Sequence, residues 1–179
     1  MKEIHPSDYV AVICEGLSEK VIISILLEEN LLKFTSDQLL NNELILNVRN
    51  AKNLQNNYLN FSFDHPVHVF SIHDSKTDLW LNNLKPVYRD KLVQAYHCVT
   101  APEIEMLMIH ALDKYDAYSK STFKKPSLYI KQFLREKPKT KKFIRDFYSK
   151  YSLEEAIRLY HSKSQNSPKF LTLQDLLKS

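Results

Sequence analysis

Four short apolar runs that alternate with helical segments constrain the fold of this chain most strongly. The runs lie at residues 8–14, 43–48, 67–72 and 94–100, and each is long enough for a buried strand but too short for a helix. Apolar residues at helical spacing occur at residues 20–32, 51–61 and 101–112. Strands that alternate with helices predict an α/β fold with a mainly parallel sheet flanked by helices. With 179 residues, the chain is long enough to bury a substantial core.

Capping residues and prolines predict where the helices begin. Ser18 is expected as the N-cap of the helix after the first strand, and Pro102 in the first turn of the helix after the fourth strand. Beyond Asp113 the strand signals stop, and helical stretches follow at residues 125–137, 140–151, 152–163 and 172–178. We therefore expect an α/β domain at residues 1–115 and a basic α-helical extension at residues 116–179.

The positive charge of the chain is concentrated in one segment. Residues 120–150 hold eleven basic residues and two acids, whereas the net charge of the whole chain is only +4. Such a basic segment beside an acidic body predicts nonspecific contacts with nucleic-acid phosphates, which weaken steeply with salt. The candidate nucleic-acid-binding residues are Lys124, Lys125, Lys131, Arg135, Lys139, Lys141, Lys142 and Arg145.

The basic segment also carries aromatic residues, at positions 123, 129, 133, 143, 147, 148 and 151. Their helical spacing favours a role in the core of the helical extension, and base stacking is the alternative. No run approaches 18 apolar residues, and residues 1–10 lack an apolar signal region, so we expect a cytoplasmic protein with no membrane partner. Cys14 and Cys98 each lie in an apolar run without zinc-site spacing and are expected as buried thiols.

Acidic residues follow three of the four predicted strands. Glu15 comes directly after the first, Asp74 follows the third with Asp78 four residues on, and Glu103 and Glu105 follow the fourth. The carboxyl ends of parallel strands form the edge of a sheet where ligands bind. Carboxylates gathered there repel one another unless a cation neutralises them, and oxygen ligands suit Mg²⁺ or Mn²⁺. The pattern therefore predicts a divalent-cation site.

Each of these acids, taken alone, also has a purely structural interpretation. Glu15 is then a solvated loop residue, Glu19 an ordinary first-turn acid stabilised by the helix dipole, and Asp74 a turn residue. Glu105 differs from them, because it stands among apolar residues and needs a partner there. His73 is a candidate neighbour of the site.

The only glycine, Gly16, directly follows Glu15. Average usage would give a chain of this length roughly a dozen glycines. Because the other turns are made with Asn, Ser, Asp and Pro, we expect Gly16 where bare backbone is needed, for a positive φ or for a close phosphate. A single glycine excludes the Gly-rich phosphate loops and the Gly-x-Ser-x-Gly elbow.

The ordered acidic motifs resemble those of Toprim domains over residues 8–115. In "CEGLSEKVII", Glu15 and Gly16 match the glutamate–glycine pair that follows the first Toprim strand. In "SIHDSKTD", Asp74 matches the first aspartate of the Asp-x-Asp motif, whereas Lys76 stands where the family has the second and Asp78 is the candidate substitute. The segment "TAPEIEMLMIHALDKYDAYSK" is similar to RloB-like Toprim proteins, with matches at Pro102, Glu105 and His110.

The resemblance implies a Mg²⁺-dependent nuclease or nucleic-acid-processing hydrolase acting in bacterial anti-phage defence. It implies that Asp74 and Glu105, assisted by Asp78, hold Mg²⁺ or Mn²⁺ against the scissile phosphate. Glu15 is then a general base or further ligand, and Gly16 lets the backbone approach the phosphate. The resemblance implies DNA or RNA as the binding partner and an AAA- or ABC-type ATPase subunit as a second partner. Whether the chain forms a homo-oligomer stays open.

Two alternative functions remain open at this point. The lysine at position 76 favours a non-catalytic Toprim-like module whose second acidic motif has degenerated and which binds nucleic acid or an ATPase partner. A structural nucleic-acid binder that uses only the basic segment is the third alternative.

Overall fold

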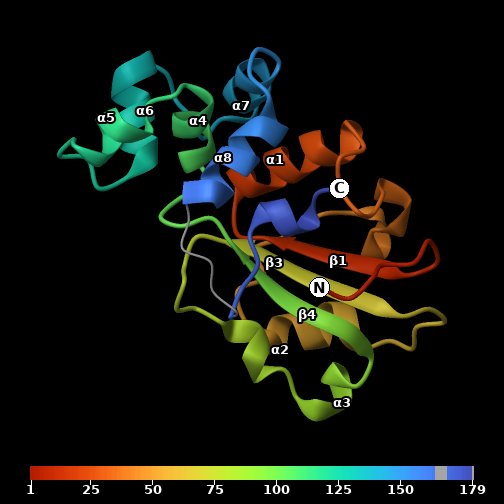
Figure 1. Cartoon of the computed structure of the whole chain (residues 1–179). Coiled ribbons are helices and arrows are strands. Elements are labelled where there is room, and N and C mark those ends of the chain that lie inside the picture. The colour runs from red at the N-terminus through yellow and green to blue at the C-terminus, as the bar shows by residue number, and fades with distance from the viewer. Residues whose placement is uncertain (164–168, 179) are drawn as a thin grey trace.

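A four-stranded parallel sheet lies at the centre of the computed structural model, which describes residues 1–163 and 169–178 (Figure 1). The strand order is β2-β1-β3-β4, and all three neighbouring pairs are parallel. The predicted α/β class with a parallel sheet is therefore confirmed. The strands are β1 (Tyr9–Cys14), β2 (Ile45–Leu46), β3 (Val67–His73) and β4 (Leu92–Val99).

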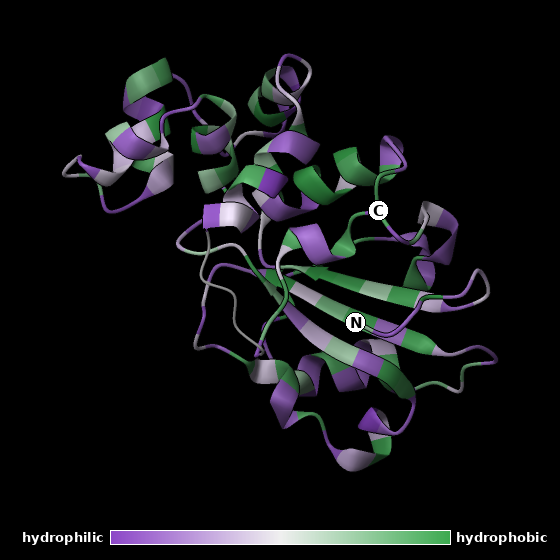
Figure 2. Ribbon diagram, viewed as in Figure 1, coloured by the Kyte–Doolittle hydropathy of each residue, from purple (hydrophilic) through white to green (hydrophobic). Residues whose placement is uncertain are grey.

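Helices cover both faces of the sheet because alternate strand residues point to opposite sides. Val10 and Val12 belong to the larger core cluster together with α1 (Leu17–Glu28), whereas Ala11 and Ile13 belong to a second cluster on the other face. Figure 2 shows that β1 and α1 are largely apolar, as a strand buried on both faces and its covering helix require. The second face is covered by α2 (Ala51–Leu54), the π-turn Gln55–Leu59, the 3₁₀-helix η4 (Trp80–Asn83) and α3 (Pro86–Arg89).

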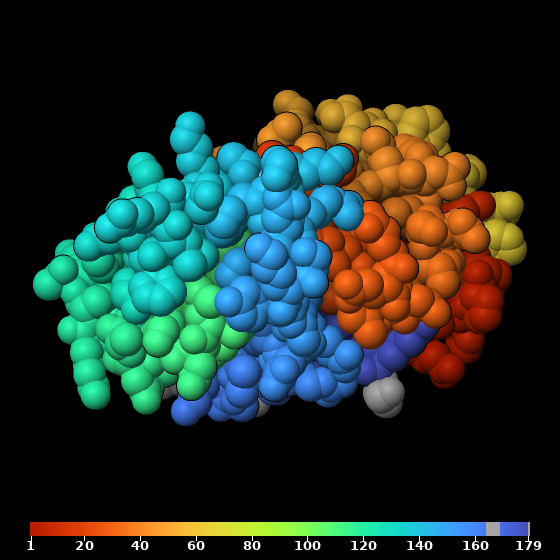
Figure 3. Space-filling model, turned by 90° about the horizontal axis from the view of Figure 1, so that it is seen from above, coloured from red at the N-terminus to blue at the C-terminus, as the bar shows by residue number. Residues whose placement is uncertain are grey.

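The remaining helices lie beyond the carboxyl end of the sheet and beside α1 (Figures 1 and 3). Ile130, Ile144 and Ile157 are fully buried in the same core cluster as Val12, which lies in β1. Side chains on both sides of the expected boundary at residues 115 and 116 therefore share one core, and the division of the chain into two domains stays a prediction. The helices are α4 (Met106–Ala111), α5 (Tyr115–Ser119), α6 (Pro126–Leu134), α7 (Lys141–Tyr148) and α8 (Leu153–Lys163).

The end of the chain returns to the outer edge of β4. The Leu171 carbonyl accepts a hydrogen bond from the Val99 N–H at 2.9 Å, and the Leu171 N–H donates to the His97 carbonyl at 2.7 Å. The final helical stretch is a 3₁₀-helix, η5 (Leu173–Leu176), rather than the expected α-helix. Its Leu173 and Leu176 are buried in the main core, so the end of the chain helps to cover the sheet.

Three local expectations were wrong. The second strand is only two residues long, because Asn47 adopts a left-handed φ of 62° that ends it. Gly16 rather than Ser18 is the N-cap of α1, and the Ser18 hydroxyl donates to Glu105 instead. Pro102 does not begin a helix, because α4 starts only at Met106 and the residues before it form a turn.

Both cysteines are buried, as expected, and burial raises the pKa of each thiol. They are therefore neutral thiols inside the apolar core at neutral pH. Within residues 1–163 and 169–178, no helix is long and apolar enough to cross a lipid bilayer.

A buried hydrogen-bond network joins the strands at the amino end of the sheet. His68 of β3 lies between two partners: its Nε2 is 2.9 Å from Asp8 Oδ2, and its Nδ1 is 2.7 Å from Gln94 Nε2 in β4. Burial alone would raise the pKa of Asp8, but hydrogen bonds from the His5 N–H and the His68 ring lower it on balance. The buried side chains of Asp8, His68 and Gln94 therefore all have hydrogen-bond partners, as burial requires.

Replacing His68 by alanine is expected to lower the free energy of unfolding by about 2–4 kcal/mol, because Asp8 and Gln94 then lose their buried partner. Urea unfolding followed by circular dichroism measures this loss. The matched variant His65→Ala, whose side chain is 46% exposed, should change the free energy by less than about 0.5 kcal/mol. Equal losses in the two variants would contradict the structural role of the network.

Candidate functional site at the carboxyl edge of the sheet

The ends of β1 and β3 place Glu15 and Asp74 side by side. The Glu15 N–H donates to the Ile72 carbonyl at 3.0 Å, which extends the β1–β3 ladder by one residue. Next to it, the Asp74 N–H donates to Glu15 Oε2 at 3.3 Å. Both side chains therefore lie at the carboxyl edge of the sheet, the edge at which parallel sheets bind ligands.

Glu103 and Glu105 reach the same edge from the turn that follows β4. The Ser127 N–H at the start of α6 donates to Glu103 Oε2 at 2.9 Å. The Ser18 hydroxyl of α1 donates to Glu105 Oε1 at 2.9 Å. The ammonium of Lys139 is 3.0 Å from Glu103 Oε1 and 3.7 Å from Glu105 Oε2, so it lies between the two carboxylates. The turn is thus tied both to α1 and to the C-terminal helices.

Glu19 is a site residue that sequence reasoning missed. It is buried in the first turn of α1, and burial together with the negative charges of Glu105 and Glu15 raises its pKa to about 7, against the opposing effect of Lys139. A signal for this position is present in the sequence. Ile22 and Ile23, three and four residues on, are fully buried, so Glu19 shares the apolar face of the helix.

We call Glu15, Glu19, Asp74, Glu103 and Glu105 the carboxylate cluster. Burial and the neighbouring charges of Glu15 and Glu103 raise the pKa of Asp74, and burial raises that of Glu105. Although burial alone would raise the pKa of Glu103, its hydrogen bonds with Ser127 and Lys139 lower it. Burial opposes the charge of Lys139, but its carboxylate partners raise its pKa above the ordinary value. The cluster therefore combines ionised carboxylates with a group that exchanges protons near neutral pH.

Gly16 allows the backbone to approach the cluster closely. Its φ of −147° is extended, so of the two expected reasons for glycine the positive φ is wrong, and the close phosphate stays a prediction. A Cβ at this position would instead meet Glu19 Oε2 at 3.1 Å. Glycine at this position therefore leaves room for the buried carboxylate of Glu19.

The loop after β3 is held by a pair of buried histidines. His73 Nε2 is 2.8 Å from His97 Nδ1, and His97 Nε2 accepts the Leu81 N–H at 3.2 Å. His97 therefore carries its proton on Nδ1, and this N–H donates a hydrogen bond to His73 Nε2. Burial lowers the pKa of both rings, that of His97 to about 4, which keeps the pair neutral. The pair fixes the loop that begins at Asp74.

Asp78 and Lys76 are exposed on that loop. The Asp78 N–H donates to the Ser75 hydroxyl at 3.0 Å, and the Asp78 carboxylate acts electrostatically on His73 and His97. In the described part of the chain, no three His, Cys, Asp or Glu side chains stand in a group that would hold a metal ion. The structure thus does not gather Asp74, Asp78 and Glu105 at one point. The all-oxygen donors of the cluster nevertheless match the chemistry of Mg²⁺ and Mn²⁺.

Three of the eight predicted nucleic-acid-binding residues form ion pairs within the chain. Lys139 contacts the carboxylate cluster, Lys142 pairs with Asp146, and Arg145 pairs with Glu28 through two hydrogen bonds of 2.6 and 2.8 Å. The other five are exposed on and around α6 and α7, namely Lys124, Lys125, Lys131, Arg135 and Lys141. Their role in binding nucleic acid stays a prediction.

Comparison of the chain with models of protein families, with curated proteins and with solved structures finds no match. The resemblance to Toprim proteins therefore stays a prediction that rests on Glu15, Gly16, Asp74 and the segment around Glu105. The functional inference rests on the geometry of the carboxylate cluster.

Glu19 is expected to titrate near pH 7 in the folded protein. Glu105→Gln should lower this pKa because it removes a negative neighbour, and Lys139→Met should raise it because it removes a positive one. Carbon-detected NMR of the side-chain carboxyls measures the pKa directly, with exposed Glu29→Gln as the control that leaves it unchanged. A wild-type pKa at the ordinary glutamate value of 4.5 would contradict the burial of this carboxylate.

The same shift predicts a pH dependence of stability. Folded Glu19 binds its proton more tightly than unfolded Glu19, so its contribution is fully present below about pH 4.5 and is lost as the pH rises towards about 7. Compared with Glu19→Gln, the wild type should lose up to about 3 kcal/mol through this window. Urea unfolding at a series of pH values measures the free energy of unfolding of both proteins. If this free energy changed with pH in the same way in both, the raised pKa of Glu19 would be contradicted.

Proposed function

We propose that this chain is a Toprim-like enzyme that hydrolyses phosphodiester bonds in nucleic acid with the help of Mg²⁺ or Mn²⁺. One observation carries the proposal: the carboxylate cluster lies at the carboxyl edge of a parallel sheet, and the basic C-terminal helices stand beside it. Carboxylates gathered at the ligand-binding edge of an open sheet are costly for folding, which supports a functional reason for them.

The side chains of the cluster divide into three roles in this proposal. The Toprim resemblance assigns the divalent cation to Asp74 and Glu105 with help from Asp78 outside the cluster, and these three side chains would have to draw together around it, since the structure does not gather them at one point. A cation held there would neutralise carboxylate charge and would supply a Lewis acid for the phosphate. Glu15 beside Asp74 serves as the general base, and Glu19 exchanges a proton near neutral pH, where a general acid or base works best.

The exposed lysines and arginines of the C-terminal helices would hold the nucleic-acid backbone in front of the cluster. Contacts of this kind are independent of sequence and weaken as salt displaces them. The resemblance to RloB-like proteins extends the proposal to anti-phage defence, with an AAA- or ABC-type ATPase as the partner subunit.

Lys139 supports a second candidate function, a non-catalytic module that binds nucleic acid or an ATPase. Its ammonium already lies between Glu103 and Glu105, where it supplies an internal positive charge. Lys76, exposed on the loop after β3, also stands where Toprim proteins carry an aspartate. In this alternative the cluster is a structural ion-pair network and needs no metal.

The cleavage test uses labelled single- and double-stranded DNA and RNA with Mg²⁺ or Mn²⁺. Wild-type protein should cleave at least one of these substrates, and Glu15→Gln and Asp74→Asn should each lower the rate by roughly 100-fold or more. The exposed residues Glu29 and Asp37 provide matched controls, Glu29→Gln and Asp37→Asn, which should retain the rate.

Absence of cleavage on every substrate, with nucleic-acid binding unchanged in Glu15→Gln and Asp74→Asn, would overturn the enzyme in favour of the non-catalytic module. The assay is repeated with the candidate ATPase present, because an enzyme that requires its partner is inactive alone.

Lys139→Met is expected to tighten Mn²⁺ binding roughly five- to tenfold, because its ammonium competes with the cation for Glu105 at a cost of about 1 kcal/mol. Isothermal titration calorimetry with Mn²⁺ measures the affinity, and the exposed Lys125→Met is the control that leaves it unchanged. Unchanged affinity in Lys139→Met would mean that the metal, if bound, lies away from Glu103 and Glu105.

A further inference from the structure

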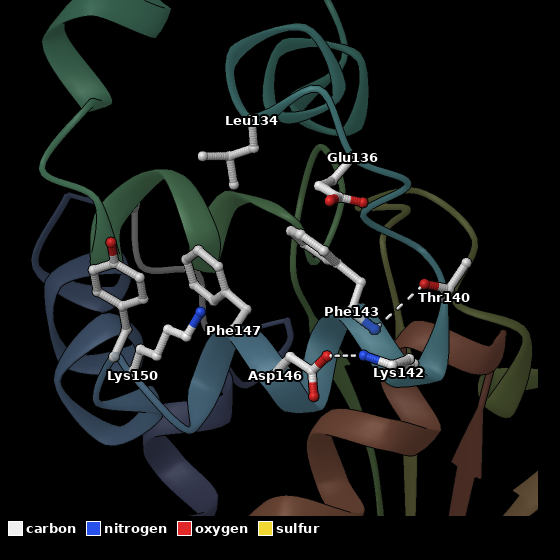
Figure 4. Close-up of a pocket in the computed structure, with 9 residues that line it drawn as sticks. Leu134, Glu136, Thr140, Lys142, Phe143, Asp146, Phe147 and Lys150 are labelled. Atoms are coloured by element: carbon white, nitrogen blue, oxygen red, sulfur yellow. Dashed lines mark hydrogen bonds and ion pairs between the residues drawn. The ribbon is translucent and has the colours of Figure 1, made fainter.

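A surface pocket of about 410 Å³ opens between the end of α6 and one face of α7 (Figure 4). Its volume falls within the range of small-ligand sites. Figure 4 shows Leu134 approaching from one side and the rings of Phe143 and Phe147 from the other. The pocket is lined by Leu134, Glu136, Thr140, Lys142, Phe143, Asp146, Phe147, Lys150 and Tyr151.

Two of the aromatic side chains that line the pocket are not fully buried in the core. Ile144 and Tyr148 point from α7 into the interior, whereas Phe143 is half-buried and the Tyr151 side chain beyond the end of the helix is exposed. The rings of Phe147 and Tyr151 stack with centroids 4.6 Å apart and planes 25° apart. The pocket thus presents the half-buried ring of Phe143 and the exposed ring of Tyr151 to solvent, with the buried ring of Phe147 stacked against Tyr151.

The polar rim of the pocket differs from the surface around it. The basic segment 120–150 contains only two acids, Glu136 and Asp146, and both line this pocket. Asp146 pairs with Lys142, whereas Glu136 forms no ion pair with any residue in the described part of the chain. Glu136 therefore provides a hydrogen-bond acceptor inside a field of positive charge.

We propose that this pocket holds one unstacked base of a single-stranded nucleic acid. The base stacks on the ring surface of Phe143 and Tyr151, and the lysines around the pocket contact the flanking phosphates. Glu136 accepts a hydrogen bond from an exocyclic amino group, as glutamate does from cytosine. This inference rests on the nucleic-acid ligand of the proposed function but not on its cleavage chemistry.

Two features favour a base over an apolar peptide side chain as the occupant. The accessible rings of Phe143 and Tyr151 match the π-face that every base presents. Lys142 and Lys150, which line the pocket, match the phosphate on each side of a base. An apolar peptide side chain gains nothing from this surrounding charge.

Fluorescence anisotropy tests the inference with end-labelled single strands of equal length, one normal and one fully abasic. Wild-type protein should bind the normal strand more tightly, and Tyr151→Ala should weaken that binding roughly 5- to 100-fold while leaving the abasic strand unchanged. Phe133→Ala is the matched control, because Phe133 is 47% exposed in the same helical region but does not line the pocket. Glu136→Gln should lower the preference for oligo-dC over oligo-dT.

Equal binding of the normal and abasic strands, or equal weakening of both by Tyr151→Ala, would overturn the inference and leave the cleavage assay unaffected. Saturation by a free nucleotide with the same affinity as the strand would assign the pocket to a small molecule and also overturn it. Failure to bind any nucleic acid would overturn both this inference and the proposed substrate. Base-dependent binding without cleavage would support the inference and overturn only the proposed hydrolysis of phosphodiester bonds.

Discussion

Repulsion among the carboxylates at the end of the sheet is the constraint on which the rest of this structure depends. Each pair of unit charges about 4 Å apart costs roughly 1–4 kcal/mol at the edge of a protein. The structure offsets this repulsion with Lys139 between Glu103 and Glu105, with the Ser127 N–H of α6 and with the Ser18 hydroxyl of α1. Because these partners come from α1, from α6 and from the turn before α7, neutralising the cluster also ties the C-terminal helices to the sheet.

The parts of the molecule that position the cluster are rigid and buried. The β1–β3 ladder continues for one residue past β1 to Glu15, and the Asp74 N–H donates to the Glu15 carboxylate, which fixes the two residues side by side. The neutral histidine pair His73–His97 fixes the loop beyond Asp74. The extended backbone at Gly16 leaves room for the Glu19 carboxylate. Negative charge is therefore held in place before any ligand arrives, which is how preorganised sites gain affinity and rate.

Most of the fold could be predicted from the sequence because it depends on local patterns. Apolar runs and helical periodicity predicted the parallel sheet and most helices, and the position of the acids after the strands predicted which edge they share. The partners of those acids could not be predicted, because they depend on contacts between distant residues. Lys139 is 36 residues from Glu103 and Ser18 is 87 residues from Glu105. The burial of Glu19 could have been predicted from its place on the apolar face of α1. The extended φ of Gly16 could not be predicted from the sequence.

Paramagnetic broadening by Mn²⁺ in the NMR spectrum of the full chain tests most directly whether the carboxylate cluster is a cation site. We expect substoichiometric Mn²⁺ to broaden the amide signals of residues 15–19, 73–75 and 103–106, and we expect Glu105→Gln to abolish this broadening. The signals of Asp8 and His68, at the opposite end of the sheet, should stay sharp. Broadening confined to exposed acids such as Glu29 and Asp37, or none at residues 15–19, would contradict a cation site in the carboxylate cluster.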